Sequence, residues 1–320
     1  MTDEDVQVAL RPAREDGGWI RPVAGRDAEP RWGVPGGVQL AIPPVGLPRG
    51  LLRIYAPYLG HPRKRLVNFI AVEPIPAGAT ARGFSELEPS TLDPGHRGKR
   101  LWSADALDTV GEASTTPARG VVDRVGGVER LTVWIGVERF DNGADVAVRA
   151  RFRADRPHEI EVAGFVREGS VALDRLILTA TMGNWARLRR LRLADRTVEP
   201  RDLWPGFART DFTEHARFPL SELTRDGEAA VVTAEGDEAD PVAVSYSDDT
   251  APHWHYEGRR GIQGWRVDDP HPELEVLVNG RWAYWASTSP IPGGVAFENF
   301  EISEPFRQGA AFRFSVEPVD

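Results

Sequence analysis

The sequence predicts an all-β protein, a large antiparallel β-sandwich with few short helices. Short apolar or alternating runs recur along the chain and are separated by Gly, Pro, Asp and Asn, the residues that favour turns. The 320 residues include 32 Gly and 26 Pro, which is typical of many short elements joined by turns. Helical periodicity is scarce, so stacking large sheets is the stable way to bury the apolar faces.

The apolar and alternating runs give the expected strands in chain order. They are residues 37–42, 51–58, 66–72, 131–137, 145–152, 159–165, 173–180, 188–193, 229–234, 242–247, 261–267, 273–278, 282–288, 295–302 and 311–317. Asp141-Asn142-Gly143 and Asn279-Gly280 are expected hairpin turns, because Asn and Gly tolerate positive φ. Only residues 103–110 and 221–224 are expected as short helices, the second with Ser221 as its N-cap.

We expect one large domain over residues 1–320, with residues 1–30 as a candidate N-terminal strand and loop extension. Two segments are weak candidates for a domain boundary, the Gly/Pro/Arg-rich residues 93–100 and the acidic residues 235–240. Strand patterning resumes directly after each of them. Both are therefore predicted to be loops within the same domain.

Charge and composition exclude several classes of function. The net charge of -9 argues against binding to nucleic acid or to an anionic membrane surface. The absence of cysteine excludes disulfides, thiolate metal sites and a cysteine nucleophile. The first residues lack the apolar core of a signal peptide, and no later run reaches the length of a membrane span. We expect a cytoplasmic protein; the oligomeric state is unknown at this stage.

The last part of the chain carries a family resemblance. Residues 294–318 consist of an expected strand, a short polar loop containing Pro305 and Gly309, and a last strand. In outline this resembles the C-terminal end of the galactose-mutarotase-like supersandwich, a fold of sugar epimerases and of sandwich domains in polysaccharide lyases and glycoside hydrolases. The resemblance implies a supersandwich fold and carbohydrate chemistry, and it transfers no catalytic residue.

The tryptophan content supports a saccharide as the partner. Ten tryptophans occur in the chain, and several lie beside charged residues, where an aromatic face can stack on a sugar ring while polar neighbours bind the hydroxyls. The alternative is that these side chains fill a sandwich core. The candidate substrate-binding residues are Trp102, Asn184, Trp185, Arg187, Trp254, Arg259 and Trp285.

Residues 253–260, HWHYEGRR, form the segment richest in groups that do chemistry. If the segment is extended, His253, His255 and Glu257 share one face and the aromatic side chains share the other. We expect no cofactor, and His255 or Tyr256 would act as a general acid or base. The alternative of a divalent metal uses His253 and His255 as ligands. Further ligands would then come from His215, Glu257, Glu298 and His271.

Two other segments supply candidate catalytic carboxylates. Glu86 and Glu88 are separated by one residue, about 7 Å along a strand, so one of them is expected to work with a partner from elsewhere. Glu298 lies between Phe297 and Phe300, where burial would raise its pKa as a general acid requires. Simple alternation places Glu298 on the same face as Phe300. The alternatives are solvent-facing carboxylates and an Arg-paired structural glutamate.

The function expected from these residues is cleavage of a glycosidic bond in a small saccharide by a glycoside hydrolase. Glu298 and one of Glu86 or Glu88 would form the acid/base pair, with His255 or Tyr256 as a supporting proton carrier. A polysaccharide or oligosaccharide lyase, with Tyr256 or His255 as base and Arg259 or Arg187 neutralising a uronate, is one alternative. A sugar epimerase and a non-catalytic sugar-binding β-sandwich module are the others.

Overall fold

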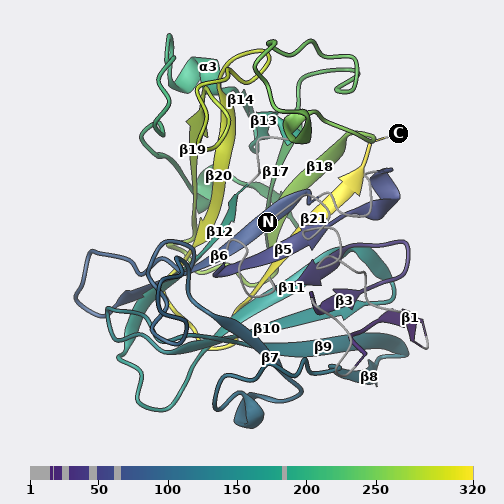
Figure 1. Cartoon of the computed structure of the whole chain (residues 1–320), viewed down its shortest axis with the longest axis vertical. Helices are drawn as coiled ribbons and strands as arrows, with labels where there is room; N and C mark the ends of the chain where they lie inside the picture. The colour runs from purple at the N-terminus through teal and green to yellow at the C-terminus, as the bar shows by residue number, and fades with distance from the viewer. Residues whose placement is uncertain are drawn as a thin grey trace.

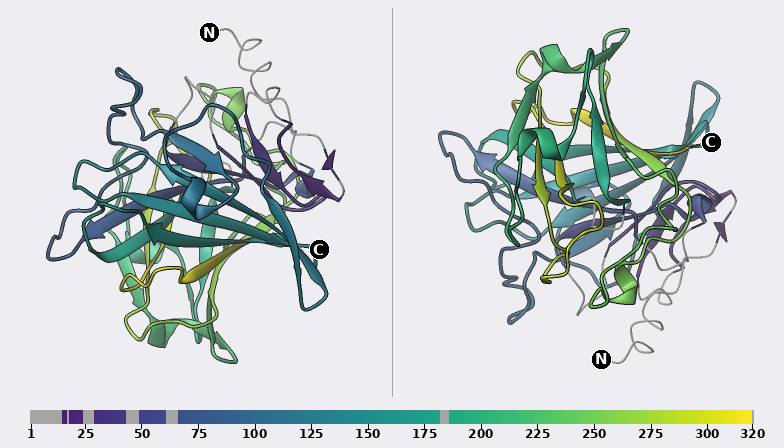
Figure 2. Two further views of the ribbon diagram at one scale, coloured as in Figure 1. Left: turned by 90° about the horizontal axis from the view of Figure 1, so that it is seen from below. Right: turned by 90° about the horizontal axis from the view of Figure 1, so that it is seen from above.

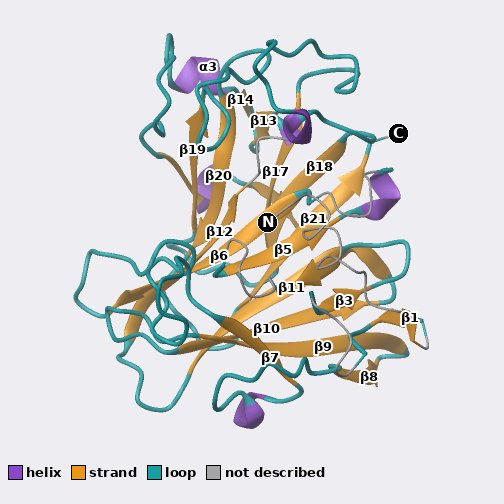
Figure 3. Cartoon of the chain, viewed as in Figure 1, coloured by secondary structure: helices purple, strands orange, loops and turns teal. Residues whose placement is uncertain are grey.

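Two large antiparallel sheets make up the protein, and Figure 1 shows their strands in a computed structural model that describes residues 15–16, 18–23, 29–42, 49–60, 66–181 and 186–319. The predicted all-β sandwich is confirmed. Strands dominate the secondary structure, and the few helical segments are short (Figure 3). Both sheets are strongly twisted, as the two views of Figure 2 show.

Sheet 1 contains ten strands within the described residues. In spatial order they are β1 (Glu15–Asp16), β2 (Trp19–Ile20), β3 (Arg31–Gly33), β4 (Gln39–Ala41), β5 (Leu51–Tyr55), β6 (Asn68–Pro76), β12 (Leu173–Thr181), β20 (Ala296–Ser303), β19 (Glu275–Arg281) and β15 (Ala216–Pro219). The order joins the first six strands of the chain to strands from its second half. Residues far apart in the sequence therefore meet on β6, β12, β20 and β19.

Sheet 2 contains eleven strands within the same ranges. Its main order is β14 (Thr197–Val198), β13 (Leu188–Arg192), β17 (Ala229–Gly236), β18 (Gly261–Val267), β21 (Ala311–Pro318), β11 (Arg156–Val166), β10 (Val146–Arg153), β9 (Val128–Val137) and β7 (Leu101–Ala104). In addition, β16 (Thr224–Asp226) pairs with β17, and β8 (Val121–Val125) pairs with β9.

The helical segments are single turns. They are α3 (Pro200–Leu203) and the 3-10 turns η1 (Pro57–Leu59), η2 (Leu107–Thr109), η3 (Leu220–Glu222) and η4 (Pro252–Trp254). The helix expected at 103–110 is wrong in its first part, which belongs to β7. Ser221 lies inside η3 and does not cap it. No helix of the described residues is long and apolar enough to cross a membrane.

One continuous core lies between the sheets. Alternate residues of β9, from Leu131 to Val137, are fully buried, while Thr132 and Trp134 between them are only partly buried. This period of two is the pattern from which the strand was expected. The same core cluster contains side chains from β6, β12, β19 and β20 of the other sheet.

Several expectations of local structure fail. Residues 242–247 and 282–288 form no strand, and the short strands β2, β3, β7, β8 and β14 to β16 were not expected. The hairpin turn at Asp141-Asn142-Gly143 is confirmed between β9 and β10, with Gly143 at a φ of 87°. The second expected turn is wrong, because Asn279-Gly280 lies inside β19.

A buried ion cluster joins the N-terminal strands of sheet 1. Glu29 is completely buried and accepts hydrogen bonds from Arg31 at 3.1 Å, Arg53 at 2.8 Å and the Tyr55 hydroxyl at 2.9 Å. The Arg31 guanidinium also lies 3.7 Å above the Tyr55 ring. One carboxylate thus pairs with two buried guanidiniums that come from β3 and β5.

Candidate functional site

A bulge in β20 sets the direction of the Glu298 side chain. Phe297 and Phe300 pair with β19 residues on either side of Asn279, so two residues of β20, Glu298 and Asn299, lie opposite that single asparagine. The extra residue is a β-bulge, which re-aims side chains locally. Because Phe297 and Phe300 both lie in the core cluster, the two residues between them project from the other face of sheet 1. Glu298 therefore does not share a face with Phe300, contrary to the simple alternation.

Glu298 is a buried carboxyl group that keeps its proton to neutral pH. Its exposed fraction is 3%, and burial raises its pKa to about 7, although the positive charge of Arg281 opposes the rise. The negative charge of Glu86 raises the pKa further. Glu298 is thus protonated when ordinary glutamates are ionised.

Glu86 reaches this region on the β6–β7 loop, which we define as residues 77–100. Burial raises the pKa of Glu86, and the charge of Arg97 opposes that rise. The charge of Glu86 acts on the pKa of Glu298, so the fold brings these two residues from distant parts of the chain into one region. These are two of the three carboxylates that the sequence offered as an acid/base pair.

Glu88, the third carboxylate, is engaged in holding the same loop. Its two oxygens accept hydrogen bonds from the backbone N–H groups of Phe84 and Asp141, each at 2.9 Å. It also lies 3.1 Å from the Nζ of Lys99, a completely buried cation. These contacts fix the loop and leave Glu86 as the partner of Glu298.

An exposed aromatic pair lies beside the same group of charges. The Arg281 guanidinium is 4.8 Å from the Phe212 ring centroid and 5.1 Å from that of Trp285. The exposed fractions are 38% for Phe212 and 44% for Trp285, whereas Arg281 is buried. Trp285, one of the predicted substrate-binding residues, therefore presents an aromatic surface next to the residue that faces Glu298.

A second polar cluster occupies the outer face of sheet 1, by which we mean the face directed away from the core cluster. Arg82 of the β6–β7 loop donates to Glu73 of β6 at 2.6 Å and to Glu301 of β20 at 2.9 Å. The Nε2 of His215 lies 2.9 Å from the other oxygen of Glu301. Both carboxyl groups are buried. The sequence analysis did not predict this cluster. Glu73 and Glu301 each lie within an otherwise apolar strand, and that pattern could have indicated it.

The HWHYEGRR segment is not a strand. Its first residues lie in η4, which begins at Pro252, and the remainder is a loop. Proline favours the first turn of a helix because its φ is already fixed near the helical value. The predicted common face of His253, His255 and Glu257 is therefore wrong.

Aromatic stacking organises this loop. Trp254 stacks on Tyr284 at 5.1 Å and His255 stacks on Tyr246 at 4.1 Å between ring centroids. The hydroxyl of Tyr246 accepts a hydrogen bond of 2.7 Å from the backbone N–H of Tyr256. Burial raises the pKa of Tyr256 above its usual value, which makes its hydroxyl a poor base at neutral pH.

Arg187 anchors the loop from beneath. It is almost completely buried, with an unusual positive φ of 41°. Its guanidinium donates to Glu238 at 3.0 Å, to the Tyr246 hydroxyl at 2.8 Å and to the carbonyl of Pro241 at 2.9 Å. The guanidinium of Arg187 is therefore occupied by hydrogen bonds to other parts of the protein.

The remaining predicted binding residues lie in other places. Trp102 is buried and donates from Nε1 to the carbonyl of Val110 at 3.0 Å. Arg259 donates to the carbonyl of Tyr58 at 2.9 Å. Asn184 and Trp185 lie outside the described residues. Trp102 and Arg259 therefore form hydrogen bonds within the protein, away from Glu298.

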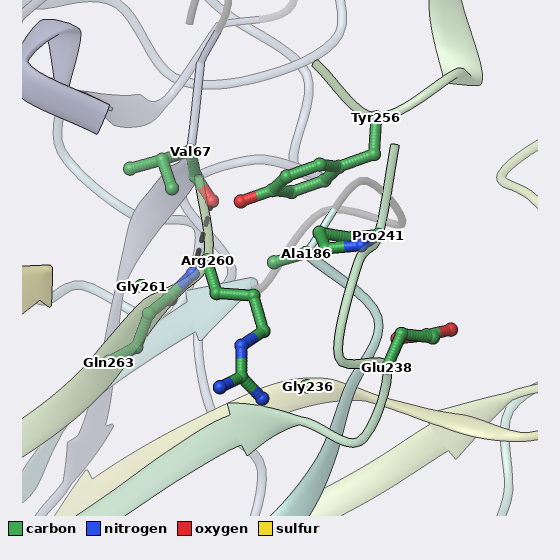
Figure 4. Close-up of a pocket in the computed structure, with 9 residues that line it drawn as sticks. All are labelled: Val67, Ala186, Gly236, Glu238, Pro241, Tyr256, Arg260, Gly261 and Gln263. Carbon is green, nitrogen blue, oxygen red and sulfur yellow. Dashed lines mark hydrogen bonds between the residues drawn. The ribbon is translucent and has the colours of Figure 1, made fainter. Parts of the chain in front are cut away.

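A small pocket lies beside the HWHYEGRR loop and is shown in Figure 4. The Arg260 side chain extends into it below Tyr256, and Gln263 donates to the carbonyl of Val67 at 3.4 Å on one side. The lining residues are Val67, Ala186, Gly236, Glu238, Pro241, Tyr256, Arg260, Gly261 and Gln263. None of the Glu298 neighbours named above belongs to this set.

Possible metal ligands are not gathered in the part of the chain that the structure describes. No group of three or more His, Asp or Glu side chains there is arranged to hold a metal ion. His255 is stacked on Tyr246, and His253 packs at 4.6 Å against Trp254. The expectation that the protein works without a metal stays a prediction.

Comparisons with known proteins supply no relative for this chain. No protein-family model, curated protein or solved structure matches it. The resemblance to galactose-mutarotase-like proteins stays a prediction, and the function has to be argued from the chemistry of the residues themselves.

Proposed function

We propose that this protein is a glycoside hydrolase that cleaves a small saccharide, with Glu298 as the general acid. The observation that carries the proposal is the buried Glu298 carboxyl, which has a pKa of about 7 and lies under the influence of Glu86. Glycosidic cleavage needs a proton donor for the leaving oxygen and a second group on the other side of the reaction. Glu298, whose burial keeps a proton on its carboxyl group to about pH 7, meets the first need.

The proposed chemistry follows from the position of the proton. Glu298 gives its proton to the glycosidic oxygen as the bond to the anomeric carbon breaks. The ring then develops positive charge, which the ionised Glu86 stabilises. Burial, with a smaller contribution from the charge of Glu86, keeps the proton on Glu298 before the reaction.

Other reactions receive less support from the side-chain contacts. A lyase would use His255 or Tyr256 as base, yet both side chains pack within the HWHYEGRR loop. Its uronate would need Arg187 or Arg259, and the Arg187 guanidinium is buried against Glu238. A sugar-binding module would need the aromatic pair but no buried protonated carboxyl. The cytoplasm remains the proposed location.

The activity is expected to fall as pH rises through about 7, because Glu298 then loses the proton that the leaving oxygen needs. The measurement is kcat/KM between pH 4 and pH 9 on a panel of aryl glycosides and disaccharides. The fall of kcat/KM at alkaline pH gives the pKa of the general acid in the free enzyme. A rate that is constant or increasing from pH 6 to pH 8 would exclude Glu298 as the acid.

Trp285→Ala is expected to raise KM about tenfold, the equivalent of roughly 1.4 kcal/mol of lost stacking, and to leave kcat nearly unchanged. Stability should change little because Trp285 is 44% exposed. Steady-state kinetics and a thermal melt test both statements. Val125→Ala removes an exposed apolar side chain from β8 and serves as the control. Equal KM values for wild type and Trp285→Ala would remove the indole from the binding surface.

A further inference from the structure

We infer that His215 is the base that activates water in the proposed cleavage, so that the sugar is released with inverted anomeric configuration. The inference rests on the proposed function and adds to it a residue, a role and a stereochemical outcome. It is drawn from the polar cluster on the outer face of sheet 1.

His215 and Glu298 lie on the same face of sheet 1, on either side of strand β19. Ala216 pairs with Val278 of β19 and packs against the core, so His215, one residue earlier, is directed to the outer face. Glu298 lies beside Asn279, the next residue of β19. Strands β15 and β20 are separated by β19 alone, two strand spacings or about 10 Å.

That separation suits an inverting reaction. The two catalytic groups of inverting glycosidases are about 6.5 to 9.5 Å apart, because a water molecule must fit beside the sugar opposite the leaving oxygen. The His215 side chain leans from β15 towards β20, since its Nε2 reaches Glu301 at 2.9 Å. This direction shortens the separation of about 10 Å between the two strands towards the range that an inverting reaction uses.

The bond to Glu301 leaves one ring nitrogen of His215 available. Glu301 is the ionised partner, because the hydrogen bond from His215 and the charge of Arg82 hold its pKa below the usual value despite burial. An ionised carboxylate accepts only, so Nε2 is the ring nitrogen that donates to Glu301, and Nδ1 is the one left to act as a base. Within the described ranges no polar group contacts Nδ1, and the side chain is 30% exposed.

The charged residues next to His215 favour its acceptance of a proton. Arg82 is shared by Glu73 and Glu301, and burial raises the pKa of Glu73 to about 7, with Arg82 opposing and Glu301 adding to the rise. Of the two carboxyl groups, Glu73 is thus the one that keeps a proton to higher pH, and Glu301 is the one that ionises more readily. The negative charge of Glu301 stabilises the imidazolium formed when Nδ1 takes a proton, which makes Glu301 and Arg82 positioning residues.

The step balances in atoms and protons. An O–H bond of water breaks and its proton passes to Nδ1 of His215, while the water oxygen forms a bond to the anomeric carbon. The glycosidic C–O bond breaks and its oxygen takes the proton of Glu298. His215 has gained one proton and Glu298 has lost one, and exchange with solvent restores both.

Two measurements test the inference. With a glycoside that the wild type cleaves, proton NMR of the first-formed sugar should show the inverted anomer, and His215→Asn should lower kcat at least about 100-fold. Separately, diethyl pyrocarbonate should modify His215, and Glu301→Gln should slow the modification of His215 while leaving that of His158 unchanged. His158 is the matched control, because it too has one ring nitrogen on a carboxylate, Glu317 at 3.0 Å, its exposed fraction is a similar 26%, and its carboxylate is not the one replaced.

The outcomes separate this inference from the proposed function. A retained anomer, or full activity of His215→Asn, would overturn the role of His215 and leave Glu298 as the acid. No turnover of any glycoside would overturn both. A rate of modification of His215 that is the same in wild type and Glu301→Gln would contradict the role of Glu301 in orienting the ring and presenting Nδ1.

Discussion

Replacing Glu298 with glutamine is expected to lower kcat/KM at least about 100-fold on any glycoside that the wild type cleaves, because the amide cannot protonate the leaving oxygen. Glutamine has nearly the same shape, so the loss reports the proton and not the packing. Glu129→Gln is the matched control, since this carboxyl group forms an exposed ion pair with Arg124. Equal turnover by wild type and Glu298→Gln would remove Glu298 from the mechanism.

The same substitution should stabilise the protein at alkaline pH. The pKa of Glu298 is raised from 4.5 to about 7 by burial, so the folded state retains a proton that the unfolded state loses. The stabilisation is therefore complete below about pH 4.5 and is lost as pH rises through 7. At pH 8 the wild type carries a buried charge that costs up to about 3 kcal/mol, and glutamine avoids that cost.

Urea unfolding of wild type and Glu298→Gln at pH 5 and pH 8 measures this effect. The difference in unfolding free energy between the two proteins should shift in favour of the variant at pH 8. The comparison removes the contribution of Glu73, which has a raised pKa in both proteins. A difference that is identical at both pH values would mean that Glu298 is already ionised at pH 5.

Glu29→Gln is expected to reduce the free energy of unfolding by about 3 to 5 kcal/mol, because it leaves buried guanidiniums without their counter-charge. Glu29 is completely buried and pairs with Arg31 and Arg53, whose side chains are almost as buried. Breaking such a cluster costs far more than breaking an exposed pair.

The control for this prediction is the same change at an exposed ion pair. Glu129 and Arg124 have exposed fractions of 41% and 64%, so Glu129→Gln should cost less than about 1 kcal/mol. Urea denaturation of both variants gives the comparison. Similar small losses for Glu29→Gln and Glu129→Gln would show that the buried cluster contributes little to stability.

Much of the fold was predictable because apolar alternation is a local property. Long strands such as β9 carry the period-two pattern in their own residues. Strands of two or three residues, such as β2 and β14, are too short to show any period, and neighbouring strands determine their existence. The HWHYEGRR segment failed because Pro252 starts a helical turn where the pattern favoured an extended chain.

The candidate site was predictable only in part. Glu298 stands out in sequence because two phenylalanines flank it, yet its direction depends on a bulge that is defined by pairing with β19. The contact with Glu86 depends on how the β6–β7 loop packs, which no local pattern contains. His215, Glu301, Arg82 and Glu73 come from four separate segments and meet only because β15, β19, β20, β12 and β6 are neighbours in sheet 1.

The direct test of the acid/base pair is a carbon-13 NMR titration of the glutamate side-chain carboxyl groups. The resonance that disappears in Glu298→Gln should titrate with a midpoint near 7 in the wild type. In Glu86→Gln the same midpoint should fall, because the negative charge that raises it has been removed. A midpoint near 4.5 in the wild type, unchanged in Glu86→Gln, would contradict the proposal that these two carboxyl groups act as a pair.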